Sequence, residues 1–305
     1  APSRKGRPLH GYKLDAAAMQ AVALEAETVA EQIGLPFRRE QQSGRAGSWT
    51  GPGVGASVDF QDHRAYYPGD DPRYINWLAY ARTGHYTMKL YREEISPRVD
   101  IALDATASMF LDEAKARRTF GLLRFCLASA QRAGADPRIH RVSPAQARAV
   151  DLEHVQTNRL ALQEEQPMGA EGAVPLFARI AWRPRAMRVL ISDLLFAADP
   201  ESFLSSLATE QSQVLLFVPW SQQEADPGWL GSLELVECES GEKQIIQLTS
   251  ADVERYCKCY REHFQNWRAA ALRRGAQVAR IQSTGTLLES LMGEALPQRV
   301  VETWT

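Results

Sequence analysis

Two short apolar runs that each end in an aspartate constrain the fold of this chain most. Residues 101–103 (Ile-Ala-Leu) lead into Asp104, and residues 189–191 (Val-Leu-Ile) lead through Ser192 into Asp193. Runs of this length and composition are typical of strands buried on both faces, as in a parallel sheet. If both runs are parallel strands of one sheet, both acids lie at carboxyl ends, the edge where open α/β sheets bind ligands.

From residue 98 onward the pattern alternates strands with helices, as a parallel sheet requires. Long helices are predicted over residues 112–133 and 250–274, the second capped by Thr249 or Ser250. Further strands are predicted over residues 138–142, 148–152, 214–218 and 277–281, with a hairpin over residues 233–248. We therefore expect an α/β fold with a mostly parallel sheet flanked by helices.

The expected domain organisation has three parts. Residues 1–13 are basic and contain glycine and proline, which is typical of a mobile arm. Residues 14–97 are expected to form a small subdomain, with one helix over residues 14–33 followed by β-rich structure. Residues 98–305 hold the α/β domain.

The composition indicates which kinds of partner are favoured and in which cellular compartment the protein is expected. The chain has 35 Lys and Arg against 37 Asp and Glu, a net charge of −2, which favours neither nucleic acid nor an anionic membrane. It has no run of about 18 apolar residues, so no membrane span is expected. Cys257 and Cys259, two of four cysteines, lie two positions apart in a predicted helix and thus on different faces. We expect reduced thiols in a cytoplasmic protein.

Oxygen-bearing side chains follow the first acid-terminated strand. Thr106 and Ser108 come at alternate positions after Asp104. With Asp193 they would form an oxygen cluster of the kind that Mg²⁺ or another divalent cation prefers. The competing interpretation is that each aspartate caps or anchors a loop.

A second acidic stretch precedes the sheet and permits a hydrolase interpretation. Its candidate metal ligands are Asp59, Asp62, Asp70 and Asp71, with His63 as base. The favoured alternative is structural: Asp70 and Asp71 cap a helix over residues 73–80, and arginines pair with the carboxylates. The aromatic residues of this stretch are expected in the subdomain's core or at its contact with the main domain: Tyr66, Tyr74, Trp77 and Tyr86.

The same stretch carries an ordered series of motifs. They are Gly53-Val54-Gly55, Asp59-Phe60, Arg64-Ala65-Tyr66, Pro68-Gly69-Asp70-Asp71, Arg73-Tyr74-Ile75-Asn76-Trp77, Ala81-Arg82-Thr83-Gly84, and Lys89 before Glu93-Glu94. The series resembles the family called domain of unknown function 58. One position departs from it, because Asn76 stands where the family has aspartate.

The resemblance extends to Asp104-Ala105-Thr106-Ala107-Ser108, which is similar to the Asp-x-Ser/Thr-x-Ser motif of von Willebrand factor A domains. Such domains hold a metal-ion-dependent adhesion site, here implied at Asp104, Thr106, Ser108 and Asp193. The site also expects a threonine on the loop between the two strands. Residues 167–173 contain none, and Glu171 is the alternative oxygen donor there.

The function that this resemblance implies is a non-enzymatic protein-binding adaptor. It would work with a MoxR-type AAA+ ATPase on client proteins, through a bound divalent cation. Two alternatives remain: a scaffold with a vestigial, metal-free site, and a metal-dependent hydrolase.

Overall fold

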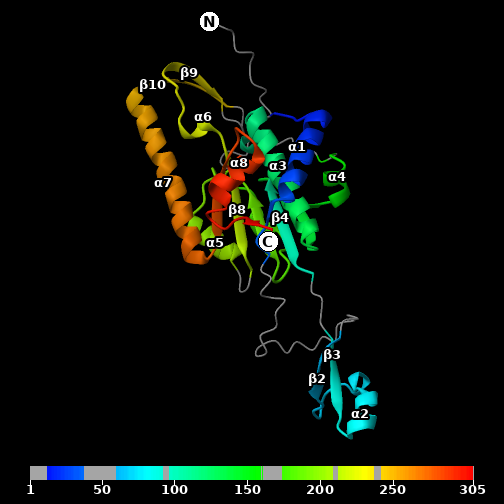
Figure 1. The fold of residues 1–305 in the computed structure, drawn as a ribbon. Helices are drawn as coiled ribbons and strands as arrows, with labels where there is room; N and C mark the ends of the chain where they lie inside the picture. Colours follow the sequence, from blue (N-terminus) through cyan, green and yellow to red (C-terminus); the bar gives the residue numbers. More distant parts are fainter. Residues whose placement is uncertain are drawn as a thin grey trace. The chain divides into compact units, whose positions relative to one another are not determined.

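The computed structural model describes residues 12–37, 60–91, 96–158, 160, 174–208, 212–236 and 242–304. They divide into two compact units (Figure 1). The sheet unit comprises residues 1–37 and 97–305, and the signature unit comprises residues 38–96. The predicted arm over residues 1–13 lies almost wholly outside the described residues.

The sheet unit is built on a six-stranded sheet in the order β11–β8–β7–β4–β5–β6. Its strands are β4 (Arg98–Asp104), β5 (Asp136–Val142), β6 (Ala147–Val150), β7 (Met187–Ile191), β8 (Val214–Trp220) and β11 (Gln277–Gln282). Within this sheet all neighbouring strands are parallel except β5 and β6. The predicted α/β class with a mostly parallel sheet is confirmed. Because the chain passes from β4 outward to β5 and then returns to β7 on the other side, the strand order reverses between β4 and β7.

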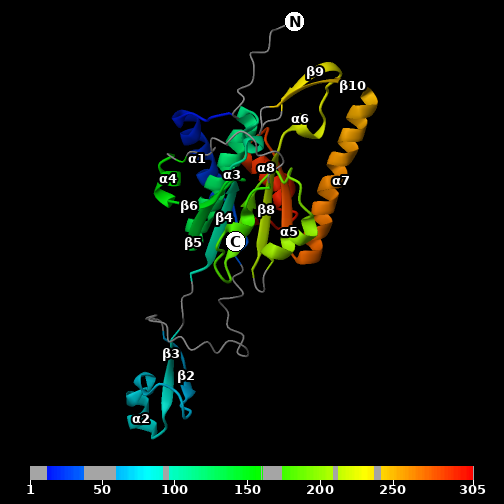
Figure 2. The same cartoon turned by 180° about the vertical axis from the view of Figure 1, so that it is seen from behind.

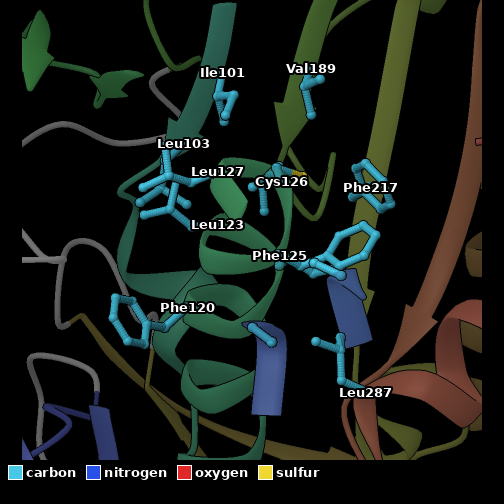
Figure 3. Packing of buried hydrophobic residues seen from close by; sticks show 14 of the residues in the cluster. Ile101, Leu103, Phe120, Leu123, Phe125, Cys126, Leu127, Val189, Phe217 and Leu287 are labelled. Carbon is cyan, nitrogen blue, oxygen red and sulfur yellow. The ribbon is translucent and has the colours of Figure 1, made fainter. Parts of the chain in front are cut away.

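Alternate residues of each strand enter two different hydrophobic cores. On β4, Ile101 and Leu103 face the core formed with α1 (Ala16–Ala30), α3 (Glu113–Arg132) and α8 (Leu287–Ser290), whereas Ala102 faces the opposite core. That second core contains α5 (Pro200–Leu207) and α7 (Ser250–Arg274). Figure 3 shows Leu123 and Leu127 of α3 beneath the strands. Burial on both faces explains why residues 101–103 of β4 and residues 189–191 of β7 are apolar.

The two long helices begin and end at recognisable caps. Asp112 accepts a hydrogen bond from the backbone of Lys115 at the start of α3. Thr249 and Asp252 form a capping box at the start of α7, which ends at Gly275 with φ of 67°. Both predicted helices are confirmed. Further elements of the sheet unit are α4 (Leu152–Gln156), α6 (Gln222–Ala225) and a hairpin of β9 (Gly231–Val236) and β10 (Lys243–Leu248) (Figure 2). The unit also has 3₁₀ helices at Ala107–Phe110 and Phe177–Arg179 and a π-helical turn at Leu291–Ala295.

Helix α1 belongs to the sheet unit, so the predicted grouping of residues 14–97 is corrected. The reason is that Val22, Ala26 and Val29 are buried in the core that α3 shares. The helix also ends at Ala30, earlier than predicted.

Residues after α1 pair with the end of the described chain. Strand β1 (Ile33–Gly34) lies antiparallel to β12 (Glu302–Thr303). A Cβ atom on Gly34 would lie 2.1 Å from a ring carbon of Trp304, so only glycine admits this ring. The Trp304 indole N–H in turn donates to the Ala30 carbonyl oxygen at 2.7 Å. None of the helices in the described ranges has the length and apolar character needed to cross a bilayer.

The described part of the signature unit contains a hairpin and two short helices. Strand β2 (Phe60–Ala65) pairs with β3 (Thr87–Tyr91), and between them lie a 3₁₀ helix (Pro72–Tyr74) and α2 (Trp77–Thr83). The single helix predicted over residues 73–80 is therefore wrong. Asn76 starts a new helix instead, because its side chain accepts from the Ala79 backbone N–H at 3.2 Å.

The aromatic residues of the signature unit do not form its interior. Trp77 is 58% exposed and Tyr86 is 47% exposed, whereas Ile75 and Met88 are buried. Tyr86 instead stacks on Tyr80, with ring centroids 4.4 Å apart. A hairpin with two short helices encloses too little volume to bury Trp77 and Tyr86 as well as the half-buried Tyr66 and Tyr74.

Candidate functional site at the carboxyl edge of the sheet

The structure brings the two acid-terminated strands together at the point where the strand order reverses. Leu103 of β4 pairs with Ile191 of β7, so Asp104 lies beside the residues that follow β7. The Ser192 hydroxyl donates to Asp104 Oδ2 at 2.7 Å. The carboxyl edge of an open sheet at a reversal of strand order is the usual ligand site of such folds.

Two hydroxyl groups, those of Thr106 and Ser108, lead from the Asp104 carboxylate towards the surface. Thr106 donates to Asp104 Oδ1 from its backbone N–H at 3.0 Å and from its hydroxyl at 2.7 Å. The hydroxyls of Thr106 and Ser108 lie 3.0 Å apart. Because the Thr106 proton is directed to Asp104, Ser108 donates to Thr106, and the Ser108 oxygen keeps its lone pairs for an outside donor. Asp104 and Thr106 are buried, whereas Ser108 is half-buried.

The second predicted acid, Asp193, is paired with a buried lysine. Lys115 Nζ lies 2.9 Å from Asp193 Oδ2 and 2.5 Å from Glu224 Oε1. Asp193 follows β7, Glu224 lies in α6 after β8, and Lys115 lies in the first turn of α3 after β4. Burial alone would disfavour the ammonium, but the charges of Asp193 and Glu224 outweigh it and raise the pKa of Lys115.

The backbone directly after Asp193 is in a left-handed conformation. Leu194 has φ of 56°, which costs a non-glycine residue about 1 kcal/mol or more. Two hydrogen bonds hold it: its N–H donates to Ser192 Oγ at 3.2 Å, and its carbonyl oxygen lies 2.7 Å from His263 Nε2 of α7. The strain places the Asp193 carboxylate against Lys115 while Leu195, the next residue, stays exposed.

The acid–base balance of Asp104 differs from that of an exposed aspartate. Burial, reinforced by the negative charge of Asp193, raises the pKa of Asp104 to about 7, although the hydrogen bonds from Ser192 and Thr106 oppose the shift. The native state therefore binds a proton at Asp104 more tightly than the unfolded chain does.

This shift predicts a pH dependence of stability. A carboxyl group with a raised native pKa contributes stability at low pH that is lost as pH rises from about 4 to about 7. We expect Asp104→Asn to become more stable relative to the wild type over that interval, by at most about 4 kcal/mol. Urea unfolding of both proteins from pH 4.5 to 8 measures the difference between their free energies of unfolding at each pH. A difference that is constant across this range would contradict the assignment.

The acids of the signature unit have local structural roles. Arg64 donates to both carboxylate oxygens of Asp70 at 2.8 and 2.7 Å, and Asp71 caps the 3₁₀ helix and pairs with Arg73. These ion pairs hold the pKa values of both aspartates below their usual range. The predicted pairing of arginines with these carboxylates and the predicted cap at Asp71 are present, whereas Asp70 caps no helix and accepts instead from the Tyr67 backbone N–H at 2.9 Å. The backbones of Asp62 and His63 lie in β2, and Asp59 lies outside the described residues.

The predicted metal site can be tested against the partners of its oxygens. Both oxygens of Asp104 accept hydrogen bonds, and those of Asp193 accept from Lys115 and from the Leu195 N–H at 3.2 Å. A divalent ion between the two aspartates would meet the Lys115 ammonium, a like charge in a region of low dielectric. As arranged, these residues do not fit a divalent cation. Residues 167–173 lie outside the described part of the chain, so a metal ligand at Glu171 stays a prediction.

Sequence patterns did not identify three residues of the site: Lys115, Ser192 and Glu224. Lysine in the first turn of a helix resembles a surface residue, and Glu224 follows a strand whose position in the sheet order was unknown. One signal was available for Lys115: it lies four and seven positions before Thr119 and Leu122, on a stripe that the fold buries.

The fold and the site together define the class of protein. It is an open, doubly wound α/β domain with a buried ionic cluster at its switch point, joined to a small β-rich unit. The chain belongs to the family described as protein of unknown function DUF58, whose model matches residues 62–266. No curated protein matches it.

Two solved structures are similar to the chain at low identity. One is an aerotolerance-related membrane protein from Bacteroides fragilis, crystallised with multiple mutations to serines, at 15% identity and a TM-score of 0.35. The other is the conserved hypothetical protein BatB from Bacteroides thetaiotaomicron, at 12% identity and a TM-score of 0.34. Each match covers 67% of this chain and 98% of the other.

Proposed function

We propose that this protein is a non-enzymatic protein-binding adaptor of von Willebrand A-like architecture. Its binding face would be the carboxyl edge of the sheet around Ser108 and Leu195. The observation that carries the proposal is the pairing of the charged groups at this edge inside the chain. A general acid, base or nucleophile must reach a substrate. Here Asp104, Asp193 and Lys115 are buried, Asp104 accepts from Ser192, and Lys115 is paired with Asp193.

The surface above the buried cluster suits a protein partner. Leu195 is 42% exposed, and beside it lies an open pocket of about 390 Å³ lined by Tyr256, Tyr260 and His263 among others. Aromatic side chains around an apolar anchor are typical of the energetic centre of a protein interface. Ser108 adds a hydrogen-bond acceptor at the same edge.

The partner class rests on the family resemblance. A MoxR-type AAA+ ATPase, with the client proteins on which it acts, is the partner that the resemblance implies. The proposal needs no divalent cation, because the edge is already charge-paired.

The test is a binding measurement with the purified MoxR-type ATPase of the same genome. Leu195→Asp is expected to weaken binding at least about tenfold, because it places a charge in the apolar centre of the interface. Its thermal melt should stay near that of the wild type, since the side chain is exposed.

The matched control is Leu272→Asp. Leu272 is 83% exposed and lies shortly before β11, at the amino edge of the sheet. Binding should be unchanged in this variant. Equal loss in both variants, or none in Leu195→Asp, would contradict the proposed face, and a wild type that does not bind the ATPase would contradict the partner.

A further inference from the structure

We propose that Lys115 is the resident cation of this domain: its ammonium group occupies, between Asp193 and Glu224, the place at the carboxyl edge where a divalent metal would otherwise sit. The edge then keeps its shape without metal. The assignment concerns the chain alone, and only its consequence for partner binding rests on the proposed function.

The first argument is convergence. Three neighbouring strands, β4, β7 and β8, direct Asp104, Asp193 and Glu224 to one end of the sheet, and Lys115 comes from the helix that follows β4. The Lys115 side chain is 0% exposed, and those of Asp193 and Glu224 are 4% and 10% exposed. Because the Lys115 side chain does not reach solvent, its charge serves as the counter-ion of the two carboxylates.

The second argument is that the position is otherwise unfavourable for lysine. Lys115 is the third residue of α3, where the backbone N–H groups carry partial positive charge that repels a cation. Full burial adds the cost of removing an ammonium from water. Only the two carboxylates offset both costs, so the cluster and the lysine depend on each other.

The third argument is that the remaining carboxylate is served by neutral donors. Asp104 accepts from the Thr106 N–H, the Thr106 hydroxyl and the Ser192 hydroxyl. The Glu224 Oε2 atom accepts from the Ser221 N–H at 2.7 Å. The hydrogen-bonding capacity of the cluster is therefore largely used without any further cation.

The test compares thermal melts of the wild type and Lys115→Met in EDTA, Mg²⁺ and Mn²⁺. The wild-type melting temperature should be the same in all three. Methionine has nearly the length of lysine without its charge, so Lys115→Met leaves Asp193 and Glu224 unpaired. Its melting temperature in EDTA should fall by about 10 °C and rise again with Mg²⁺ or Mn²⁺.

Two controls separate this effect from general metal binding. Lys258→Met removes a lysine whose side chain is 70% exposed and should show no metal response. Lys115→Met combined with Asp193→Asn should lose the response, because a ligand is missing. If Lys115→Met does not fold, Lys115→Gln, which is uncharged but can still donate hydrogen bonds to both carboxylates, is judged by the same criterion.

Two outcomes overturn the assignment. One is a wild type stabilised by Mg²⁺ or Mn²⁺ in a manner that Asp193→Asn abolishes. The other is a Lys115→Met protein that no divalent cation stabilises, since the cluster would then not be a cation site. Because no partner is present, the result is independent of the binding measurement with the ATPase.

Discussion

Replacing Asp193 with alanine is expected to lower the free energy of unfolding by about 4 kcal/mol, because it removes one of the two counter-ions of a fully buried ammonium. Lys115 would keep only Glu224, at a position that water does not reach. The Leu195 N–H, which donates to Asp193 Oδ1, would also lose its acceptor. Urea unfolding followed by circular dichroism measures the change.

A double-mutant cycle identifies the source of this loss. In a Lys115→Met background, Asp193→Ala removes an unpaired carboxylate, so its cost should be much smaller or reversed in sign. Asp199→Ala is the matched control: Asp199 lies six residues further along the chain, is exposed and caps α5. It should cost about 1 kcal/mol in either background. Equal costs of Asp193→Ala with and without Lys115 would show that the ion pair is not the cause.

A second large effect is expected at Asp100, in the interior of β4. This aspartate is 0% exposed, and Arg183 donates to it from its backbone N–H at 2.7 Å and from its guanidinium Nε at 2.6 Å. Asp100→Ala should cost about 3 kcal/mol, because a guanidinium that is 11% exposed loses its buried counter-ion.

Asp136 provides the comparison for Asp100 on the same arginine. It accepts from Arg183 Nη1 at 2.5 Å, but its side chain is 63% exposed. Asp136→Ala should cost less than about 1 kcal/mol, since water replaces the carboxylate. Thermal and urea unfolding of Asp100→Ala and Asp136→Ala measure the two losses of stability. Similar losses for the two would mean that burial does not set the strength of these ion pairs.

The main sheet was predictable because its central strands contain buried apolar runs and alternate with helices. Residues 101–103 and 189–191 are buried on both faces, and such runs have few other stable arrangements. The proximity of Asp104 to Asp193 followed from the rule that parallel strands end at one edge. The signature unit was less predictable, because Asn76 divides its helix and Trp77 and Tyr86 are too large for its small interior.

The ion pairs at the carboxyl edge could not be predicted, because they depend on the strand order and on backbone conformation, which the sequence pattern does not give. The strand order places β8 beside β7, and only this brings Glu224 to Lys115. The left-handed backbone of Leu194 could not be predicted from the sequence, because the position does not hold a glycine. Motif reasoning identified the acids and hydroxyls but left out the cation, which the first turn of α3 supplies.

The packing of α1 against α3 has a consequence for the signature unit. Because α1 and β4 belong to one folded body, the signature unit is an insertion with two attachments to that body, whereas an appended domain has one. Folding of the sheet unit therefore fixes both flanks of the insertion, residues 37 and 97, in one body. The entropy cost of that closure grows only slowly with the number of residues between them, so the stability of the sheet unit should depend little on the length of the insertion.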